Sequence, residues 1–483
     1  MSNALAVPGI PDGQIVELKV QVPPGQVIQY NLAALASAFE ITDPGRLAVE
    51  TDGSRTALVT IYPTNPLMEM PPPSPEDMVM DEYGRIINGR YHNGRPSRRR
   101  LFDPISGSAQ RAMVFGTTGA GKSRVVQYTL ACEKRNGICT WHGDLKGGQS
   151  APEAEGQVDW FATSQEEVIL MLRAAVAVAE VRQRRYRALG RNAFLINDPD
   201  PLISVRIDEA NRLLEKGAPY RDEGTYLVKE LGRTGRSVGI GIELDAQASH
   251  LEELGGSDTL RAMLKEGDIT LLRWSSSMMR QLVTDGLLPA GEQLAPIPKT
   301  LRPKVLRSQF ATGPAPADVD LCDTQGMAYM LSGPSPTSLM RHFRIGSIRP
   351  MPGLDPEILA LYGPGDPRRL EEGSLEAAAE AYEARGTAAM DALCLAVQED
   401  QKKATAKAQA AKGGRGAALL ADRIRTVLAE NEDALSPDEV LVLVNADGGP
   451  EVKAIGSVRN ALGVLVDQGD VVRAGRGLYE IAR

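Results

Sequence analysis

Hydrophobic and polar residues follow two different periods along the chain, and these periods divide it into regions. Val16 to Val22 alternates strictly between apolar and polar residues, as a half-buried strand does. From Gln110 to about Ile348, short apolar runs alternate with segments of helical period. This alternation favours a mainly parallel sheet with helices on both faces. The hydrophobic pattern therefore predicts an α/β fold for the centre of the chain.

Changes in composition mark the predicted boundaries between regions. A proline-rich stretch around residues 71–75 breaks both periods, and glycines interrupt the helical pattern near residues 413–416. The predicted organisation is a small α+β N-terminal domain (1–67), a linker (68–80), a central α/β domain (81–350), a helical and then flexible connection (351–414) and a C-terminal domain (415–483).

The C-terminal region shows three helical patterns followed by a hairpin. Apolar residues recur at helical spacing from Ala417 to Glu430, and a third helix is predicted over Val452 to Val466. Between them, Ser436 to Glu439 (SPDE) has the features of a helix N-terminus, with serine at the N-cap, proline in the first turn and glutamate three residues on. This order resembles a winged helix-turn-helix.

In a winged helix, the third helix enters the major groove and the hairpin grips the DNA backbone. The residues predicted to face DNA are Lys453, Ser457, Arg459, Asn460, Arg473 and Arg476. However, residues 415–483 carry eight basic and eleven acidic side chains. A protein–protein role for this domain therefore stays open.

Overall composition adds few constraints. The chain has 54 Lys and Arg residues against 62 Asp and Glu residues, a net charge of −8, so any basic face for DNA must be local. No apolar run approaches the roughly 20 residues that span a bilayer, and the N-terminus lacks the features of a signal peptide. The four cysteines include no C-x-x-C pair. These features predict a soluble cytoplasmic protein whose membrane role, if any, needs a partner.

The most specific motif is G-x-x-x-x-G-K-[ST] at residues 116–123, between the apolar run Ala112–Phe115 and a helix-forming segment. Its glycines let backbone N–H groups surround a phosphate, and the following helix N-terminus adds partial positive charge. Lys122 is placed to reach the β- and γ-phosphates, and Ser123 to hold Mg²⁺. The motif predicts ATP and Mg²⁺ as cofactors, with phosphate-binding residues Gly116, Thr117, Thr118, Gly119, Ala120, Gly121, Lys122 and Ser123.

Two later strands end in residues that suit the same chemistry. The apolar run from Leu202 ends at Asp208 and Glu209, where Asp208 is predicted to bind Mg²⁺ and Glu209 to polarise the attacking water. A further strand from Gly239 ends at Gln247, which is predicted to contact the γ-phosphate or its water. Apolar runs that end in acids are common, and Gln247 also suits an ordinary helix cap. Each signal is therefore weak alone.

Five segments in this order resemble motifs of the FtsK/SpoIIIE family of DNA-pumping motors, over about Val16 to Ile348. They are TGAGKS (118–123), similar to TGSGKS; GDLKGG (143–148), similar to D-P-K-G; EVRQRRY (180–186), similar to E-M-x-x-R-Y; IDE (207–209), similar to V-D-E; and the stretch 235–247, similar to G-R-A-A-G-I-H-L-x-x-A-T-Q. The chain departs from the family at Leu145, which replaces proline, and at Asp245-Ala246-Gln247, which replaces A-T-Q.

The resemblance implies a RecA-like P-loop motor that forms a homo-oligomeric ring, a hexamer, around double-stranded DNA. The ATP site would then lie between subunits and receive an arginine from a neighbour, for which Arg273, Arg236 and Arg233 stay open. Residues 326–344 and the absence of membrane helices resemble actinobacterial plasmid-transfer proteins. That likeness implies conjugative plasmid or integrative-element transfer, with a membrane-associated transfer protein as a partner.

Three other functions remain open from the sequence. They are a chromosome-segregation DNA motor, a protein-translocating secretion ATPase of the same superfamily, and a DNA-binding regulator that uses nucleotide only for assembly. A basic helix over residues 182–191 is either a further phosphate-contacting face or a solvated helix end. Its arginines are Arg182, Arg184, Arg185, Arg187 and Arg191.

Overall fold

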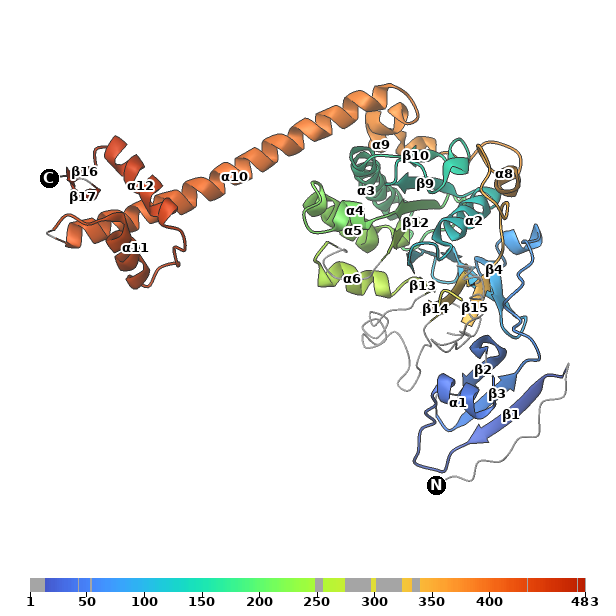
Figure 1. Ribbon diagram of the computed structural model, residues 1–483. Helices are drawn as coiled ribbons and strands as arrows, with labels where there is room; N and C mark the ends of the chain where they lie inside the picture. Colours follow the sequence, from blue (N-terminus) through green and yellow to red (C-terminus); the bar gives the residue numbers. More distant parts are fainter. Residues whose placement is uncertain are drawn as a thin grey trace. The chain divides into compact units, whose positions relative to one another are not determined.

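Figure 1 shows the computed structural model of the 483-residue chain. It describes residues 14–247 apart from 42 and 53, then 255–273, 297–300, 324–331, 339–475 apart from 432, and 477–482, with backbone only at 33, 44, 261, 264, 265 and 406–418. The chain divides into two compact units, Met1–Cys394 and Leu395–Arg483. Each unit is described by itself.

A ten-stranded sheet forms the centre of the first unit, in the order β10-β9-β11-β12-β8-β13-β14-β15-β4-β5. The first six strands in this order are parallel to one another and the remaining pairs are antiparallel. The predicted α/β class with a mainly parallel sheet is therefore confirmed. The parallel strands are β10 (Trp160–Ala162), β9 (Cys139–Asp144), β11 (Ile203–Asp208), β12 (Ile240–Ala246), β8 (Arg111–Gly116) and β13 (Asp268–Leu272). The antiparallel strands are β14 (Met327–Leu331), β15 (Leu339–His342), β4 (Arg85–Tyr91) and β5 (Pro96–Arg100).

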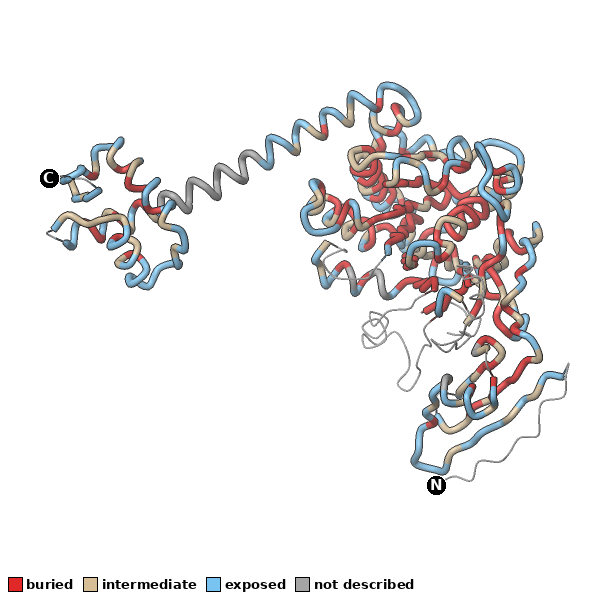
Figure 2. The backbone as a smooth tube through the Cα atoms, in the orientation of Figure 1, coloured by how far each residue is buried: buried red, intermediate tan, exposed pale blue. Residues whose placement is uncertain are grey.

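Helices cover both faces of the parallel strands. Successive side chains of a strand point to opposite faces, so residues of β9 that are an odd number of positions apart face different helices. Thr140 donates to Glu133 of α2, whereas a side chain at Gly143 would meet Val168 of α3. Buried residues therefore concentrate in the sheet and the helices packed on it (Figure 2). The helices are α2 (Lys122–Arg135), α3 (Gln165–Ala188), α4 (Asn211–Leu214), α5 (Arg221–Thr234), α6 (Asp258–Lys265), α8 (Pro356–Tyr362) and α9 (Glu372–Ala384).

Two smaller sheets lie outside the central sheet. β1 (Val16–Gln21), β3 (Thr56–Ile61) and β2 (Leu47–Thr51) pair in that order, all antiparallel, and α1 (Leu32–Ala38) packs on them. They enclose a core of their own, formed by Ala36, Ile41, Leu47, Val59 and Ile61. β6 (Phe102–Asp103) and β7 (Ser108–Ala109) form a short hairpin just before β8.

Residues 355–394 pack on the helices of the first unit, although the sequence predicted a connecting segment there. Glu371 accepts two hydrogen bonds from the guanidinium of Arg182, at 3.0 and 2.7 Å. Lys134 and Arg135, at the end of α2, donate to the carbonyl oxygens of Gly363 and Leu361 at the end of α8. These contacts explain why the first unit extends to Cys394.

The same contacts test the prediction that residues 182–191 form a basic, phosphate-contacting face. Arg182 is 0% exposed and Arg185 binds Asp200 and Glu371, so the hypothesis of a phosphate-contacting face is wrong for these two residues. Arg191 pairs with Asp198, and Arg184 and Arg187 are exposed.

The second unit contains the predicted order of helices and hairpin. α10 (Ala389–Glu430) enters it from the first unit and continues through the glycines at which a flexible connection was predicted. α11 (Pro437–Ala446) begins with the predicted capping box between Ser436 and Glu439, which is confirmed. α12 (Ile455–Asp467), β16 (Val471–Gly475) and β17 (Leu478–Ile481) complete the unit. Its assignment as a winged helix stays a prediction. Its core consists of Ala421, Ile424, Val427, Leu428, Val440, Val444, Val458, Ala461, Leu462, Leu465 and Val471.

Two further observations concern membrane-spanning helices and the cysteines. No helix among the described residues has both the length and the apolar character needed to cross a membrane. Cys132, Cys139 and Cys394 carry free thiols, and Cys322 lies outside the described residues.

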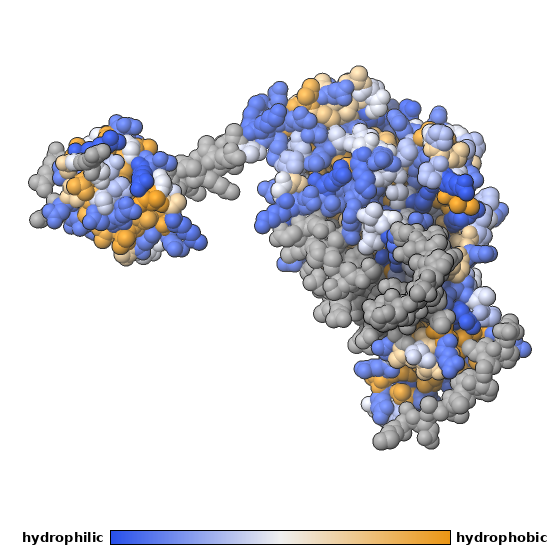
Figure 3. Space-filling model, in the orientation of Figure 1, coloured by the Kyte–Doolittle hydropathy of each residue, from blue (hydrophilic) through white to orange (hydrophobic). Residues whose placement is uncertain are grey.

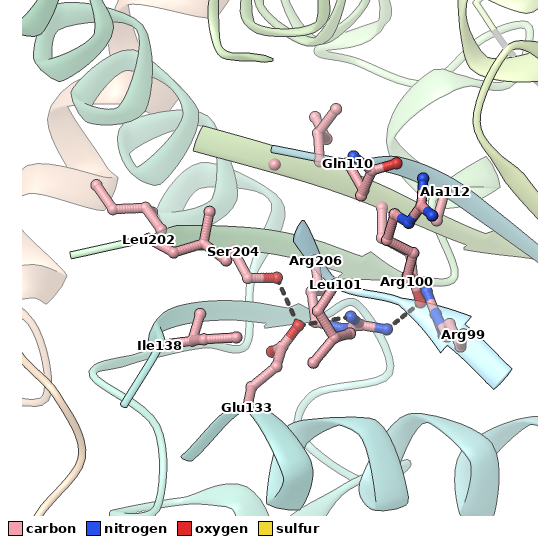
Figure 4. Close-up of a pocket in the computed structure, with 14 residues that line it drawn as sticks. Arg99, Arg100, Leu101, Gln110, Ala112, Glu133, Ile138, Leu202, Ser204 and Arg206 are labelled. Carbon is pink, nitrogen blue, oxygen red and sulfur yellow. Dashed lines mark hydrogen bonds and ion pairs between the residues drawn. The ribbon is translucent and has the colours of Figure 1, made fainter. Parts of the chain in front are cut away.

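Four buried charges connect the two halves of the central sheet. Arg99 of β5 and Arg206 of β11 both bind Glu243 of β12, and Arg206 also binds Glu133 of α2 at 2.8 Å (Figure 4). Each of these side chains is at most 4% exposed. In sheet order five strands separate β12 from β5, yet Arg99 also donates to Thr129 of α2. The antiparallel half therefore curls back past α2 to bring Arg99 to Glu243.

We expect Glu243→Ala to destabilise the first unit by about 3 to 5 kcal/mol, because it leaves two buried guanidinium groups without their shared carboxylate. The free energy of unfolding from chemical denaturation measures this. The matched control is Glu266→Ala, which removes a 67% exposed carboxylate from Arg111 and should cost less than about 1 kcal/mol. Equal effects of the two substitutions would contradict the role of the buried charges.

Candidate nucleoside triphosphate site

The predicted phosphate loop connects β8 to α2 and has a tightly constrained backbone. Gly121, at the N-cap of α2, has φ of 102°, a conformation that favours glycine. A Cβ atom there would lie 3.0 Å from the backbone nitrogen of Gly326, which precedes β14. The N–H of Gly326 donates to the carbonyl of Ala120 at 2.9 Å. The loop is therefore held against the turn that leads into β14.

The strand order brings the separate motifs to one edge of the sheet. β12 lies between β11 and β8, with Leu244 opposite Ile207 and Ala246 opposite Phe115. Because the carboxyl ends of parallel strands meet at the same edge, Asp208, Gln247 and the phosphate loop converge there. Lys122 Nζ lies 2.5 Å from Asp208 Oδ1 and 2.8 Å from Glu209 Oε1.

Glu209 is surrounded by three side chains from different elements. Besides Lys122, Lys146 Nζ lies 2.7 Å from its Oε1 atom, and Gln247 donates to its Oε2 atom at 3.2 Å. Glu209 has φ of 55°, an uncommon conformation for a residue with a side chain, which turns it out of β11. No role was predicted for Lys146, whose signal was its place in the GDLKGG stretch, just beyond the end of β9.

The charges in this cluster stabilise one another. Burial alone would raise the pKa of Glu209, but hydrogen bonds from Lys122 and Lys146 outweigh it and lower the pKa to about 2. Burial would likewise lower the pKa of Lys122, but Asp208 and Asp245 outweigh it and raise this pKa. Glu209 and Lys122 are therefore both ionised near neutral pH. Lys122 acts as the counter-ion of the Asp208 and Glu209 carboxylates.

The oxygen atoms available here fit Mg²⁺. Asp208 Oδ2 is buried and has no hydrogen-bond partner among the described residues, and Ser123 lines the adjoining cleft. Carboxylate and hydroxyl oxygens are the donors that Mg²⁺ prefers. Both carboxylate oxygens of Asp245 are also buried, with no hydrogen-bond partner in the part of the chain that the structure describes. Burial, reinforced by the charge of Asp208, raises the pKa of Asp245 to about 7. The sequence comparison had marked Asp245 only as a departure from A-T-Q.

The three candidate arginines lie in different places. Arg273, directly after β13, is 8% exposed and its guanidinium donates to the carbonyl of Thr118 in the phosphate loop. This contact favours a role for Arg273 in supporting the phosphate loop of its own subunit. Arg236 begins the 3-10 helix η4 (Arg236–Val238), before β12 and therefore at the opposite edge of the sheet. Arg233 lies nearby in the last turn of α5. Both are exposed, as a residue that acts on a neighbouring subunit must be.

A cleft of about 750 Å³ adjoins the phosphate loop and falls within the range typical of small-molecule sites. Lys122, Lys146, Glu209 and Gln247 contribute to its lining. Residues from before β4, and others in and after β15, line it as well.

In the second unit, the residues predicted to face DNA are exposed. They are Lys453, Ser457, Arg459, Asn460 and Arg473, whereas Arg476 lies outside the described residues. The Arg473 guanidinium carbon lies 5.9 Å from the ring centre of Tyr479. Apolar residues are also exposed on the second unit (Figure 3). Val442 of α11 is 68% exposed and Val464 of α12 is 51% exposed.

The fold and the convergence of the phosphate loop with Asp208 define a P-loop α/β protein. Solved structures similar to this chain include the pCW3 conjugation coupling protein TcpA in a monomer form with ATPγS, at 14% identity and a TM-score of 0.44, covering 69% of this chain and 86% of that one. They also include the cytoplasmic domain of the Thermomonospora curvata Type VII secretion ATPase EccC, at 18% identity and a TM-score of 0.43, covering 62% and 33% of the two chains. EssC (ATPases 2 and 3) from Geobacillus thermodenitrificans matches at 15% identity and a TM-score of 0.41, covering 68% and 54%.

The chain thus spans about a third of the EccC chain and about half of the EssC chain. No protein-family model matches the chain, and no curated protein matches it. The function proposed below rests on this chain's own motifs and geometry.

His342, which lines the cleft, should make the first unit sensitive to acid. Its Nε2 atom is buried and has no hydrogen-bond partner within the described ranges, and burial lowers the pKa of His342 from 6.5 to about 4. Between these values the unfolded chain binds a proton that the folded chain does not bind, so the folded state is disfavoured as the pH falls. From pH 7.5 to 5.0 this group should lower the free energy of unfolding by about 2 kcal/mol.

Chemical denaturation of wild type and His342→Asn at both pH values checks this expectation. The stability difference between the two proteins should shrink by about 2 kcal/mol at the lower pH, because only the wild type carries the group. A difference that is the same at both pH values would contradict it.

Proposed function

We propose that this chain is an ATP-driven translocase of double-stranded DNA that acts in conjugative plasmid or integrative-element transfer. The observation that carries the ATPase proposal is the contact of Lys122, in the phosphate loop, with Asp208 and Glu209 at the end of β11. The motif order shared with DNA-pumping motors supports DNA as the substrate.

Binding of ATP would replace one set of negative charges with another. Backbone N–H groups of residues 116–123 and the N-terminus of α2 are placed to hold the phosphates. Lys122 would leave its carboxylate partners for the β- and γ-phosphate oxygens, whose charge takes their place. Mg²⁺, when bound to Ser123 and Asp208, would neutralise charge on the phosphates.

Release of Lys122 would change the surroundings of Glu209. Without Lys122, the Glu209 carboxylate would keep its contacts with Lys146 and Gln247. The hydrogen-bonding capacity that Lys122 leaves would let Glu209 orient a water molecule and accept its proton. Gln247 would contact the same water or the γ-phosphate. The chain's own residues thus supply binding, orientation and a proton acceptor.

A homo-oligomeric ring, a hexamer, would complete the site. Arg273 donates to the carbonyl of Thr118 in the phosphate loop of the same chain, whereas Arg236 and Arg233 are exposed and precede β12. A guanidinium from a neighbouring subunit would stabilise the charge of the transferred phosphoryl group and couple hydrolysis to assembly. In this proposal the second unit recruits the motor to a DNA sequence, and a membrane-associated transfer protein provides the exit.

A protein-translocating secretion ATPase is the second candidate. One observation favours it: residues 415–483 carry eleven acidic against eight basic side chains, and Val442 and Val464 are exposed there, which suits a protein partner better than DNA. Its motor would use the same residues for hydrolysis. The two candidates therefore differ in the polymer that stimulates turnover.

Steady-state ATPase assays with and without duplex DNA test the proposal. We expect duplex DNA to stimulate turnover, Lys122→Ala to abolish nucleotide binding, and Glu209→Gln to lower kcat by about 10² or more while nucleotide still binds, because only the proton acceptor is lost. Lys216→Ala, an exposed lysine outside the cleft, is the control and should be unchanged. Stimulation by a secretion substrate but not by DNA would favour the second candidate, and unchanged turnover in Glu209→Gln would exclude Glu209 as the base.

DNA selectivity of the second unit is tested by Arg459→Glu in the full chain. If α12 contacts base edges, this substitution should weaken sequence-selective binding by about tenfold or more, because it replaces an attractive group with a repulsive one. Electrophoretic mobility shifts with specific and unrelated duplexes measure the ratio. Lys403→Glu on α10 makes the same change of charge elsewhere. A selectivity ratio that is the same in both variants would remove α12 as the reader.

A further inference from the structure

The cleft beside the phosphate loop has two chemically different sides. On one side, Lys146, Glu209 and Gln247 follow β9, β11 and β12. Groups of this kind act at the γ-phosphate. The other side lies beyond β8 in the opposite direction along the sheet, where β14 and β15 are found. A triphosphate held with its γ-phosphate at Glu209 would therefore direct its nucleoside towards the side of β14 and β15.

A chain of hydrogen bonds builds this second side onto the phosphate loop. Gly326 binds Ala120 of the loop, and the carbonyl of Gly326 accepts from the N–H of His342 at 2.9 Å. The neighbouring Arg341 donates from Nη1 to the carbonyls of Leu67 and Met68, at 2.6 and 2.8 Å. Its Nε atom donates to the carbonyl of Gln325 at 2.9 Å. Residues 67–70 are thereby fixed at the cleft although they precede the central sheet.

A group of apolar residues lies among the polar residues of this side. Met68 and Met70, from the segment that follows the N-terminal sheet, line the cleft together with Phe343, Ile345 and Ile348. Ile348 is 85% exposed and Met68 is half-buried, whereas Met70 is 9% exposed. The apolar surface that faces solvent in the cleft therefore comes mainly from Met68 and Ile348. Flexible, polarisable thioether side chains pack well against flat aromatic rings. A purine base is the part of a nucleotide that would cover such a surface.

We propose that Met68 and Met70, held in place by Arg341, form the base-binding wall of the nucleotide site. This inference rests on the proposed ATPase function and adds the location and the chemical class of the base subsite. Arg341 is a positioning residue, since its guanidinium fixes the backbone that carries Met68. Because β3 ends at Ile61, only a few residues before Leu67, nucleotide occupancy would also be linked to the N-terminal sheet.

Comparison of ATPγS with inorganic tripolyphosphate separates the base wall from the phosphate loop. Isothermal titration calorimetry of the full chain would measure both ligands with wild type, Met68→Ala/Met70→Ala and Arg341→Lys. We expect ATPγS to bind about tenfold more weakly to the double variant, because it loses apolar contact with the base, and tripolyphosphate to bind as to wild type. Arg341→Lys should show the same pattern more weakly, since an ammonium group lacks the planar fork that reaches several carbonyls.

Met80→Ala is the matched control, because Met80 is half-buried like Met68 but does not line the cleft. It should leave both affinities unchanged. If the double variant lost the same affinity for both ligands, or lost affinity for neither, the base-binding wall would be overturned. The proposed ATPase would stand in either case. A wild type that binds neither ligand would overturn the proposed ATPase and this inference with it.

Discussion

The first unit depends on one electrostatic arrangement, the Lys122 ammonium held between the carboxylates of Asp208 and Glu209. One ammonium group and two carboxylates can be buried together at the edge of a sheet only if each has a partner, because an isolated buried charge is strongly disfavoured. Lys146 and Gln247 supply the remaining partners of Glu209. A triphosphate is a suitable replacement for the carboxylates, because it brings comparable negative charge to the same ammonium group.

A second set of buried charges shapes the sheet around this site. Glu243 binds Arg99 and Arg206, and it joins β5 to strands that lie far from it in sheet order. The same strand β12 ends next to Gln247 and carries Asp245. The curl of the antiparallel strands around α2 also carries β15 to the cleft. Fold stability and the geometry of the site are therefore supported by the same strands.

The sequence predicted the parts of the site that depend on local pattern. The phosphate loop, the end of β11 and the end of β12 are each recognisable from an apolar run followed by particular residues, and parallel strands bring such ends together. Residues whose position depends on distant pairing were not predicted. Glu371, which binds Arg182, follows it by 189 residues, and Arg341 reaches Leu67 across 274 residues. Lys146 lay in a recognised segment, but its contact with Glu209 follows from the pairing of β9 with β11.

The hydrogen bonds between Arg341 and residues 67 and 68 bear on where the chain can be divided. Composition places a natural boundary in the proline-rich stretch, and a fragment that begins at residue 81 would retain every recognisable nucleotide motif. Such a fragment would nevertheless expose the guanidinium of Arg341 and leave one side of the cleft unbuilt. In this protein a fragment that contains all the motifs can therefore still be too short to contain the whole cleft.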